Sequence, residues 1–347
     1  MKCCEEDDKV LEAKFPVNLQ SHIQYGDNVS AFIVLLNNLG VSCDRIEELF
    51  DNAYNISLCQ STIINKINKC SKLIEPTLNE IKERLSKSKF IHCDESGVRV
   101  EGLTMWTHSA STDLYTYLTC SAKRGYDGIV DNGVLVSMVG GCAIHDCWAP
   151  YWKFHNVEHA ICLQHILREL KWVNQCAPNQ KWDVKFRDFL LKVKKAKEKL
   201  IAEDKNSFDK EALAKIKDEF DKIIKLGEEE NPLPEQTEIK RGRKPKGEIR
   251  ALVDRLKRYK TETLKFAEDF SIPFTNNTAE QSVRNVKVKI KNAGCFRSKE
   301  GADNYLKIRS FLDTAKKQGK NLMESLLQVF RGNSNYILVP TSKKQAE

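Results

Sequence analysis

The chain has 347 residues, 12 cysteines and a formal net charge of +8. This length is sufficient for about two or three structural units with separate cores. The N-terminus is acidic and lacks the pattern of a secretory signal, and the apolar run AFIVLL is far shorter than the ~20 residues of a membrane span. The composition therefore predicts a cytoplasmic protein with reduced cysteines and no membrane partner, and it argues against a secreted disulfide scaffold.

The N-terminal region, residues 1–88, is predicted to be helical. Between Ser42 and Ile74 apolar residues recur at helical spacing with a break at NIS, residues 55–57, and Ser42 and Ser61 are available as helix caps. Two helices separated in this way can form a DNA-reading helix-turn-helix, but a plain helical hairpin has the same pattern. The sequence leaves both interpretations open.

Residues 89–150 are predicted to form the first part of a catalytic core. Four segments, FIHC, GVRVEG, LTMWTHSAS and LYTYLTCS, are rich in β-branched and aromatic residues. Turn signals such as Glu101-Gly102 and Thr112-Asp113 separate them, which predicts a three-stranded antiparallel meander. A helical stretch near GYDGIVDNGVLVSMV and a fourth strand, GCAIHD, follow. This order indicates an α/β fold in which helices flank a mixed sheet.

Residues 151–272 are predicted to be a helical insertion that carries a basic segment. The helical period persists from FRDFLLKVKK to DKIIKLGEEE without a strand signal, and NPLPEQ ends this block as a loop. In KRGRKPKGEIRALVDRLKRYK, ten basic residues oppose two acidic ones. Such a segment is typical of polyanion binding, and a solvated helix face is the alternative. Residues 273–347 are then expected to complete the core and to add C-terminal helices.

Three carboxylates occupy positions where ligands gather. Asp94 is predicted at the end of the first strand and Asp146 at the end of the fourth, and ligands of open sheets bind at strand ends. Glu280 is predicted to open a helix, with Thr278 as its cap and Gln281 at the capping-box position. Together the three side chains would provide oxygen ligands for two Mg²⁺ ions that act on a phosphodiester.

Basic residues surround Glu280 in the sequence. Arg284 lies one turn further along the same predicted helix, so a surface ion pair with Arg284 is the alternative role of Glu280. The segment RGRKPKG resembles a minor-groove arm or a flexible basic linker, and we favour phosphate contact without base readout. The residues expected to contact DNA are Asn277, Arg284, Lys287, Lys289, Lys291, Arg297, Lys240, Arg241, Arg243 and Lys244.

Two smaller features have competing interpretations. Cys162 and His165 lie one turn apart on a predicted helix and can bind zinc if a further side chain completes the site, namely Cys142, Cys147 or His159. No CxxC pair accompanies them, so packing of the helix on the core is favoured. Three aromatic residues after the fourth strand can stack on an unpaired base, although core packing is the default: Trp148, Tyr151 and Trp152.

Five ordered blocks, HCDESGVRVEG, HDCWAPYWKF, HAICLQHILREL, KRGRKPK and PFTNNTAEQSVRNVKVKIKNAGCFRSKEGA, closely resemble those of bacterial transposases of insertion sequence family 66. The resemblance extends from about Tyr25 to Gly332. Where relatives commonly have NNxAERxIR and CNAHHLRE, this chain has Gln281 for the arginine and Ile166 for the second histidine. Longer relatives carry an N-terminal zinc-binding and coiled segment, of which KCCEEDD is expected to be the tail.

The resemblance implies a ribonuclease-H-like fold with an Asp–Asp–Glu triad, interrupted by a helical insertion between the second Asp and the Glu. The blocks place this triad at Asp94, Asp146 and Glu280. The implied activity is Mg²⁺-dependent cutting at element ends, for which Mn²⁺ can substitute, followed by attack of the freed 3′-hydroxyl on target DNA. The implied partners are the DNA of the element ends, the target DNA, further copies of the chain in a synaptic complex, and accessory proteins of the same element. A nucleoid-associated location is expected, and a catalytically inactive DNA-binding remnant is the alternative.

Overall fold

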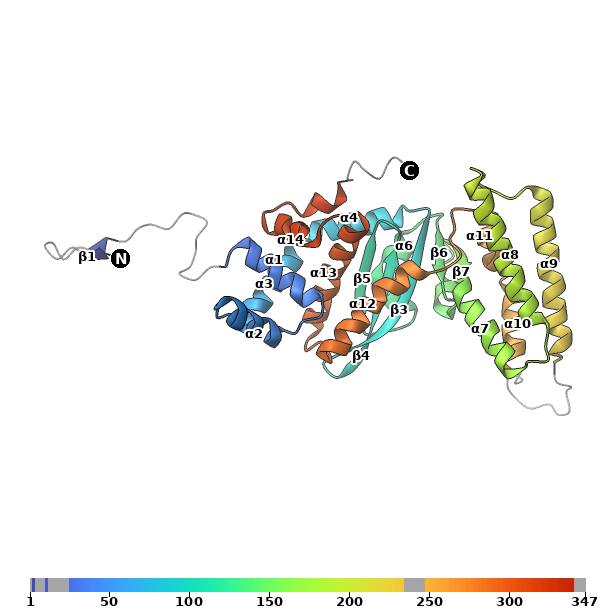
Figure 1. Ribbon diagram of the computed structural model, residues 1–347, viewed down its shortest axis with the longest axis horizontal. Helices are drawn as coiled ribbons and strands as arrows, with labels where there is room; N and C mark the ends of the chain where they lie inside the picture. The colour runs from blue at the N-terminus through green and yellow to red at the C-terminus, as the bar shows by residue number, and fades with distance from the viewer. Residues whose placement is uncertain (1, 4–9, 12–24, 234–246, 340–347) are drawn as a thin grey trace.

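In the computed structural model, which describes residues 2–3, 10–11, 25–233 and 247–339, the chain has an α/β fold built on one mixed five-stranded sheet (Figure 1). Helices from both ends of the chain lie at one end of the long axis, and the helices of the predicted insertion lie at the other. Two short strands, β1 (Lys2–Cys3) and β2 (Val10–Leu11), pair antiparallel outside this sheet. In the described residues, no helix is long and apolar enough to cross a membrane.

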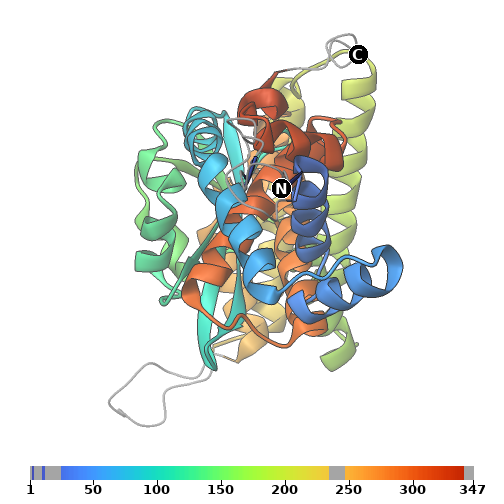
Figure 2. The same cartoon turned by 90° about the vertical axis from the view of Figure 1, so that its left-hand side faces the viewer.

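The N-terminal region, residues 1–88, contains four helices in its described part, and also β1 and β2, which were not among the predicted elements. Its helices are α1 (Asp27–Asn38), α2 (Cys43–Tyr54), α3 (Gln60–Leu73) and α4 (Glu75–Ser86). Ser42 is the N-cap residue of α2, but α3 begins one residue before Ser61, so Cys59 is its N-cap residue and the predicted second cap is wrong. Figure 2 shows α1 to α3 in front of the sheet when the molecule is viewed from this end.

The sheet has the strand order β5-β4-β3-β6-β7. Its strands are β3 (Phe90–Val100), β4 (Leu103–Ser111), β5 (Thr116–Ser121), β6 (Cys142–His145) and β7 (Glu158–Ile161). The first three form the predicted antiparallel meander. The strand β6 pairs parallel with β3, and β7 pairs parallel with β6. Glu101 and Gly102 both have positive φ, 52° and 76°, as a tight hairpin turn requires.

Two details of the sheet differ from the sequence prediction. The segments FIHC and GVRVEG form one continuous strand, β3, so Asp94 lies inside a strand and not at its end. The strand β7 lies in the range 151–272, for which only helices were predicted. With only four residues, EHAI, the strand β7 is too short to show the alternation from which strands are recognised.

Helices cover both faces of the sheet. Along the chain, α5 (Tyr126–Asn132) and α6 (Val134–Ser137) connect β5 to β6, and a 3₁₀ turn, Ala149–Lys153, follows β6. The insertion contains α7 (Leu163–Cys176), α8 (Trp182–Ala202), α9 (Lys210–Glu230), α10 (Glu248–Arg258) and α11 (Lys260–Glu268). Their apolar faces share one core with β6 and β7, which fixes the insertion against the edge of the sheet.

The C-terminal part returns to the sheet. It consists of α12 (Asn277–Ala293), α13 (Lys299–Lys317), α14 (Leu322–Phe330) and a 3₁₀ turn, Ser334–Leu338. Val286 of α12 and Tyr305 of α13 pack on Val98 and Val100 of β3. These two valines share a strand face with Asp94, because side chains alternate along a strand. The face of β3 that carries Asp94 is therefore the face that α12 covers.

Candidate metal-binding site

Asp94 and Asp146 occupy matching positions on neighbouring parallel strands. The register of β3 and β6 joins Phe90 to Cys142, an offset of 52 residues (142 − 90). The same offset leads from Asp94 to Asp146, which is the first residue after β6. The parallel register therefore places the two carboxylates side by side, just beyond the end of the paired segment.

Asp94 lies in a partly buried and negatively charged environment. Its Oδ1 accepts a hydrogen bond of 2.9 Å from the backbone N–H of Glu95. Burial raises the pKa of Asp94 to about 7, and the negative charges of Glu95, Asp146 and Glu280 contribute in the same direction. The three predicted acids are thus close enough to interact electrostatically. Carboxylates that oppose one another's ionisation in this way favour a bound cation.

Glu95 is a fourth carboxylate of this region, and it was not among the predicted site residues. Its side chain is 2% exposed and accepts hydrogen bonds of 3.1 Å from Arg124 Nη2 and from the Tyr151 hydroxyl. The Arg124 guanidinium also lies over the rings of Trp106 and Trp148, 4.7 and 4.5 Å from their centroids. Arg124 therefore holds the loop after β6 against β3 and β4. The acid is visible in the sequence beside Asp94, but its distant cation is not.

The loop after β6 contains the three aromatic residues considered for base stacking. The backbone N–H of Trp148 donates a hydrogen bond of 3.1 Å to Asp146 Oδ1, which fixes this carboxylate. Tyr151 is only 2% exposed, and the ring of Trp152 is stacked on that of Tyr259 at 4.1 Å. Each ring therefore packs against protein groups, as the default interpretation expected.

Asn276 ties the start of α12 to β3. This residue is 1% exposed, its Oδ1 lies 2.8 Å from His92 Nδ1, and its Nδ2 donates a hydrogen bond of 2.7 Å to the Cys93 carbonyl. Asn276 also accepts the backbone N–H of Glu280 at 3.3 Å. The first turn of α12, with Glu280 on it, is therefore anchored to the two strand residues that precede Asp94.

The predicted cap of α12 is wrong. The helix begins at Asn277, so Asn276 and not Thr278 is the N-cap residue, and a capping box with Gln281 does not form. The physical reason is that the side-chain amide of Asn276 forms its hydrogen bonds with His92 and Cys93 of β3. The same side chain therefore makes no capping hydrogen bond to α12.

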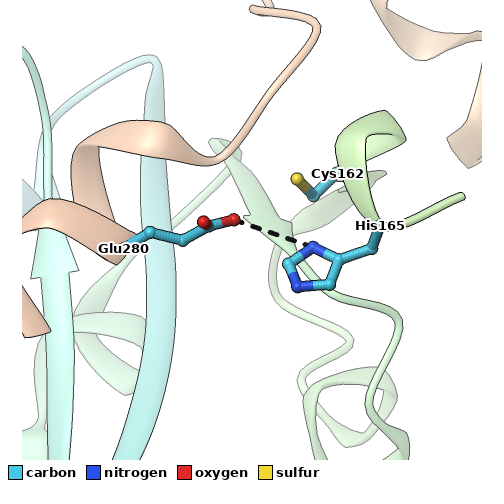
Figure 3. Close-up of side chains that lie close together, drawn as sticks. All are labelled: Cys162, His165 and Glu280. Atoms are coloured by element: carbon cyan, nitrogen blue, oxygen red, sulfur yellow. Dashed lines mark ion pairs between the residues drawn. The ribbon is translucent and has the colours of Figure 1, made fainter. Parts of the chain in front are cut away.

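The Glu280 carboxylate points toward α7 (Figure 3). Its Oε1 lies 3.8 Å from His165 Nδ1, and its Oε2 lies 3.7 Å from Arg168 Nη2. Among the described residues Arg284 is exposed and forms no ion pair with Glu280, so the alternative surface pair is absent. The block CLQHILRE contained this signal, because His165 and Arg168 lie three residues apart on one face of a helix.

In the described ranges, one group of three possible metal ligands has all its ligand atoms within 4.8 Å, namely Cys162, His165 and Glu280. Cys162 and His165 were considered as zinc ligands in the sequence, but packing of the helix was favoured. None of the three residues considered as a further ligand joins this group: Cys142, Cys147 and His159. Asp94 and Asp146 also lie outside it. A pair of ions distributes its ligands over a wider volume than one ion does, so this spacing is compatible with a two-ion site.

The basic residues of α12 separate into two faces. At about 100° per residue, Glu280, Arg284, Lys287 and Lys291 fall within about 60° of arc, and Lys289 lies about 180° from Glu280. Arg284, Lys287 and Lys291 are exposed, as are Asn277 and Arg297. The other four residues expected to contact DNA lie outside the described residues: Lys240, Arg241, Arg243 and Lys244.

Lys289 was predicted to contact DNA, but its side chain is buried and so is not available to DNA. It is 7% exposed, and its Nζ donates hydrogen bonds of 3.3 and 3.2 Å to the carbonyls of Asn37 and Val41 at the end of α1. Burial lowers the pKa of Lys289. The ammonium therefore joins α12 to the N-terminal helices, and helical spacing alone could have separated this residue from Lys287.

Residues 22–304 of the chain match the family model described as Transposase IS66 family. The match ends before Gly332, where the resemblance was expected to end. No curated protein matches the chain. Since the matched range covers well over half of the 347 residues, the chain belongs to the IS66 family of transposases.

Proposed function

We propose that this protein is a DNA transposase with a ribonuclease-H-like core, in which Asp94, Asp146 and Glu280 hold two Mg²⁺ ions. The observation that carries the proposal is the meeting of β3, β6 and the first turn of α12, which brings the segments of all three acids to one place on the sheet. Strand register brings Asp146 beside Asp94, and Asn276 anchors the helix turn that carries Glu280. The strand order, with an antiparallel hairpin on one side and parallel strands on the other, supports the assigned core.

The residues fit divalent cations with oxygen ligands. The acidic side chains offer hard oxygen donors, and the buried Glu280 Oε1 has no hydrogen-bond partner in the part of the chain that the structure describes. Burial and mutual repulsion oppose the ionised form of Asp94, and a cation between the acids removes that penalty. When bound, two Mg²⁺ ions supply activation of the attacking oxygen and stabilisation of the leaving oxygen in phosphodiester displacement.

The chain's own side chains position this site and its DNA. Arg124 and Tyr151 hold Glu95, and Trp148 N–H holds Asp146 Oδ1, so the loop after β6 keeps its carboxylate in place. The exposed stripe of α12 extends from Glu280 along the helix and offers cations to DNA phosphates on both sides of the reacting bond.

Cleavage of DNA that carries the element ends tests the proposed function. We expect the purified chain to cut this DNA and to join the freed 3′-hydroxyl to a target in the presence of Mg²⁺ or Mn²⁺. With EDTA, cutting should stop while DNA binding persists, because the phosphate contacts do not require the ions. A protein that binds the ends but never cuts them with either ion is a DNA-binding remnant, and the proposed chemistry is then wrong.

Lys287 and Lys289 form a matched pair that tests the assignment of the DNA face. Lys287→Ala should weaken DNA binding and reduce the salt dependence of log K by about one unit, with little change in stability. Lys289→Ala should lower the free energy of unfolding by about 2 kcal/mol, because the part-buried carbonyls of Asn37 and Val41 lose the ammonium donor that joins α12 to the end of α1. Urea unfolding and DNA titrations at two salt concentrations measure both effects. The opposite pattern would place the DNA on the other face of α12.

A further inference from the structure

The group formed by Cys162, His165 and Glu280 is built at the meeting point of two helix starts (Figure 3). Cys162 is the N-cap residue of α7, and His165 and Glu280 lie in the first turns of α7 and α12. The backbone N–H of Asn276 donates to Cys162 Sγ at 3.2 Å. The two helix ends are therefore bonded to each other, so the group does not depend on flexible side chains meeting by chance.

Two atoms of this group are buried and unpaired. His165 Nδ1 and Glu280 Oε1 lie 3.8 Å apart, which is too far for a hydrogen bond, and neither has another partner among the described residues. Tetrahedral nitrogen and oxygen ligands of one zinc ion lie roughly 3.3–3.4 Å apart at the usual bond lengths. A contraction of a few tenths of an ångström therefore allows a single ion to satisfy both atoms.

We propose that Cys162, His165 and Glu280 bind Zn²⁺ at a site distinct from the Mg²⁺ site and share Glu280 with it. A thiolate and an imidazole select zinc over magnesium, which prefers oxygen ligands. The thiol proton leaves to solvent as the sulfur–zinc bond forms, and three protein ligands leave the fourth position to water. Arg168 faces Glu280 Oε2, so Oε1 is the oxygen that meets the ion.

This site has a consequence that rests on the proposed function. Glu280 is a ligand of the proposed Mg²⁺ site, and a zinc ion that holds its carboxylate against α7 withdraws it from Asp94 and Asp146. Zinc should therefore inhibit Mg²⁺-dependent cleavage, and excess Mg²⁺ should relieve the inhibition.

Cobalt and zinc titrations of the full chain test the binding site directly. With Co²⁺ we expect a thiolate-to-cobalt charge-transfer band in the wild type that is lost in Cys162→Ser. Competition with a chromophoric chelator should show zinc affinity at least about tenfold weaker in Cys162→Ser and in His165→Ala. The matched control is Cys176→Ser, at the exposed end of the same helix, which should retain both the band and the affinity. Circular dichroism checks that each variant is folded.

The outcomes separate the two proposals. A folded wild type without the band, or a Cys162→Ser variant that binds zinc as tightly as Cys176→Ser, overturns the zinc site whether or not the protein cuts DNA. A protein with the band but without Mg²⁺-dependent cleavage keeps the zinc site and loses the proposed function. If the two sites share Glu280, zinc should slow cleavage at least about tenfold more in the wild type than in Cys162→Ser. Equal inhibition of the two proteins overturns the shared use of Glu280.

Discussion

Asp146→Asn is expected to lower the rate of strand cleavage by roughly 10³-fold or more, about 4 kcal/mol in activation free energy. The asparagine keeps an oxygen that can accept the Trp148 N–H, so the loop after β6 should retain its conformation. Only the negative charge is lost, and with it a ligand that divalent cations require. DNA affinity should stay within a few-fold of the wild type.

The control for this variant is Asp127→Asn. Asp127 lies on α5, is 61% exposed and pairs with Lys123, so its charge should matter little to the fold and not at all to the chemistry. Gel assays with end-containing DNA measure cleavage and binding for both variants. If Asp146→Asn cuts as fast as Asp127→Asn, then Asp146 is not a ligand of the catalytic ions.

Asp94→Asn is expected to stabilise the metal-free protein while it removes cleavage. The pKa of Asp94 is about 7 in the folded chain, whereas an aspartate in an unfolded chain has a pKa of 3.8. Between these values the folded state retains a proton that the unfolded state has released, so stability falls as pH rises from about 4 to 7 and is constant above. Asparagine carries no such penalty, because it cannot ionise.

The gain in unfolding free energy should therefore depend on pH. Relative to the wild type it should be small near pH 4 and should rise to on the order of 2 kcal/mol at pH 8, which allows for partial exposure of the carboxylate. Denaturant unfolding in EDTA at both pH values measures it. Mg²⁺ should raise the melting temperature of the wild type more than that of the variant. If the gain in unfolding free energy over the wild type is the same at pH 8 and at pH 4, then ionisation of Asp94 does not destabilise the folded protein.

Local patterns in the sequence were sufficient for much of the fold. The meander could be predicted because β-branched runs and the Glu101-Gly102 turn are local signals, and α12 could be predicted because its apolar residues recur with the helical period. The strand β7 was missed, since four residues between helices show no period. The cap of α12 was misassigned, because the side chain of Asn276 bonds a strand far away in the sequence.

Within the candidate site, the sequence supplied residue types and spacings but not partners. The offset of 52 residues between Asp94 and Asp146 is already present in the chain, but its meaning depends on the register of β3 and β6, which only the structure gives. The sequence does not show that Arg124 contacts Glu95, or that His165 lies beside Glu280. Each pair meets because strands and helices from separate segments pack on one sheet.

The carboxylates and cations of this IS66-family protein, and most of its helices and strands, could be recognised from composition and local periodicity, with β7 as an exception. The support that Lys289 gives to the N-terminal helices, and the turn of the Glu280 carboxylate toward Cys162 and His165, became apparent from the folded chain alone. Contacts between distant segments depend on how whole apolar faces pack together, and no short stretch of sequence contains that information.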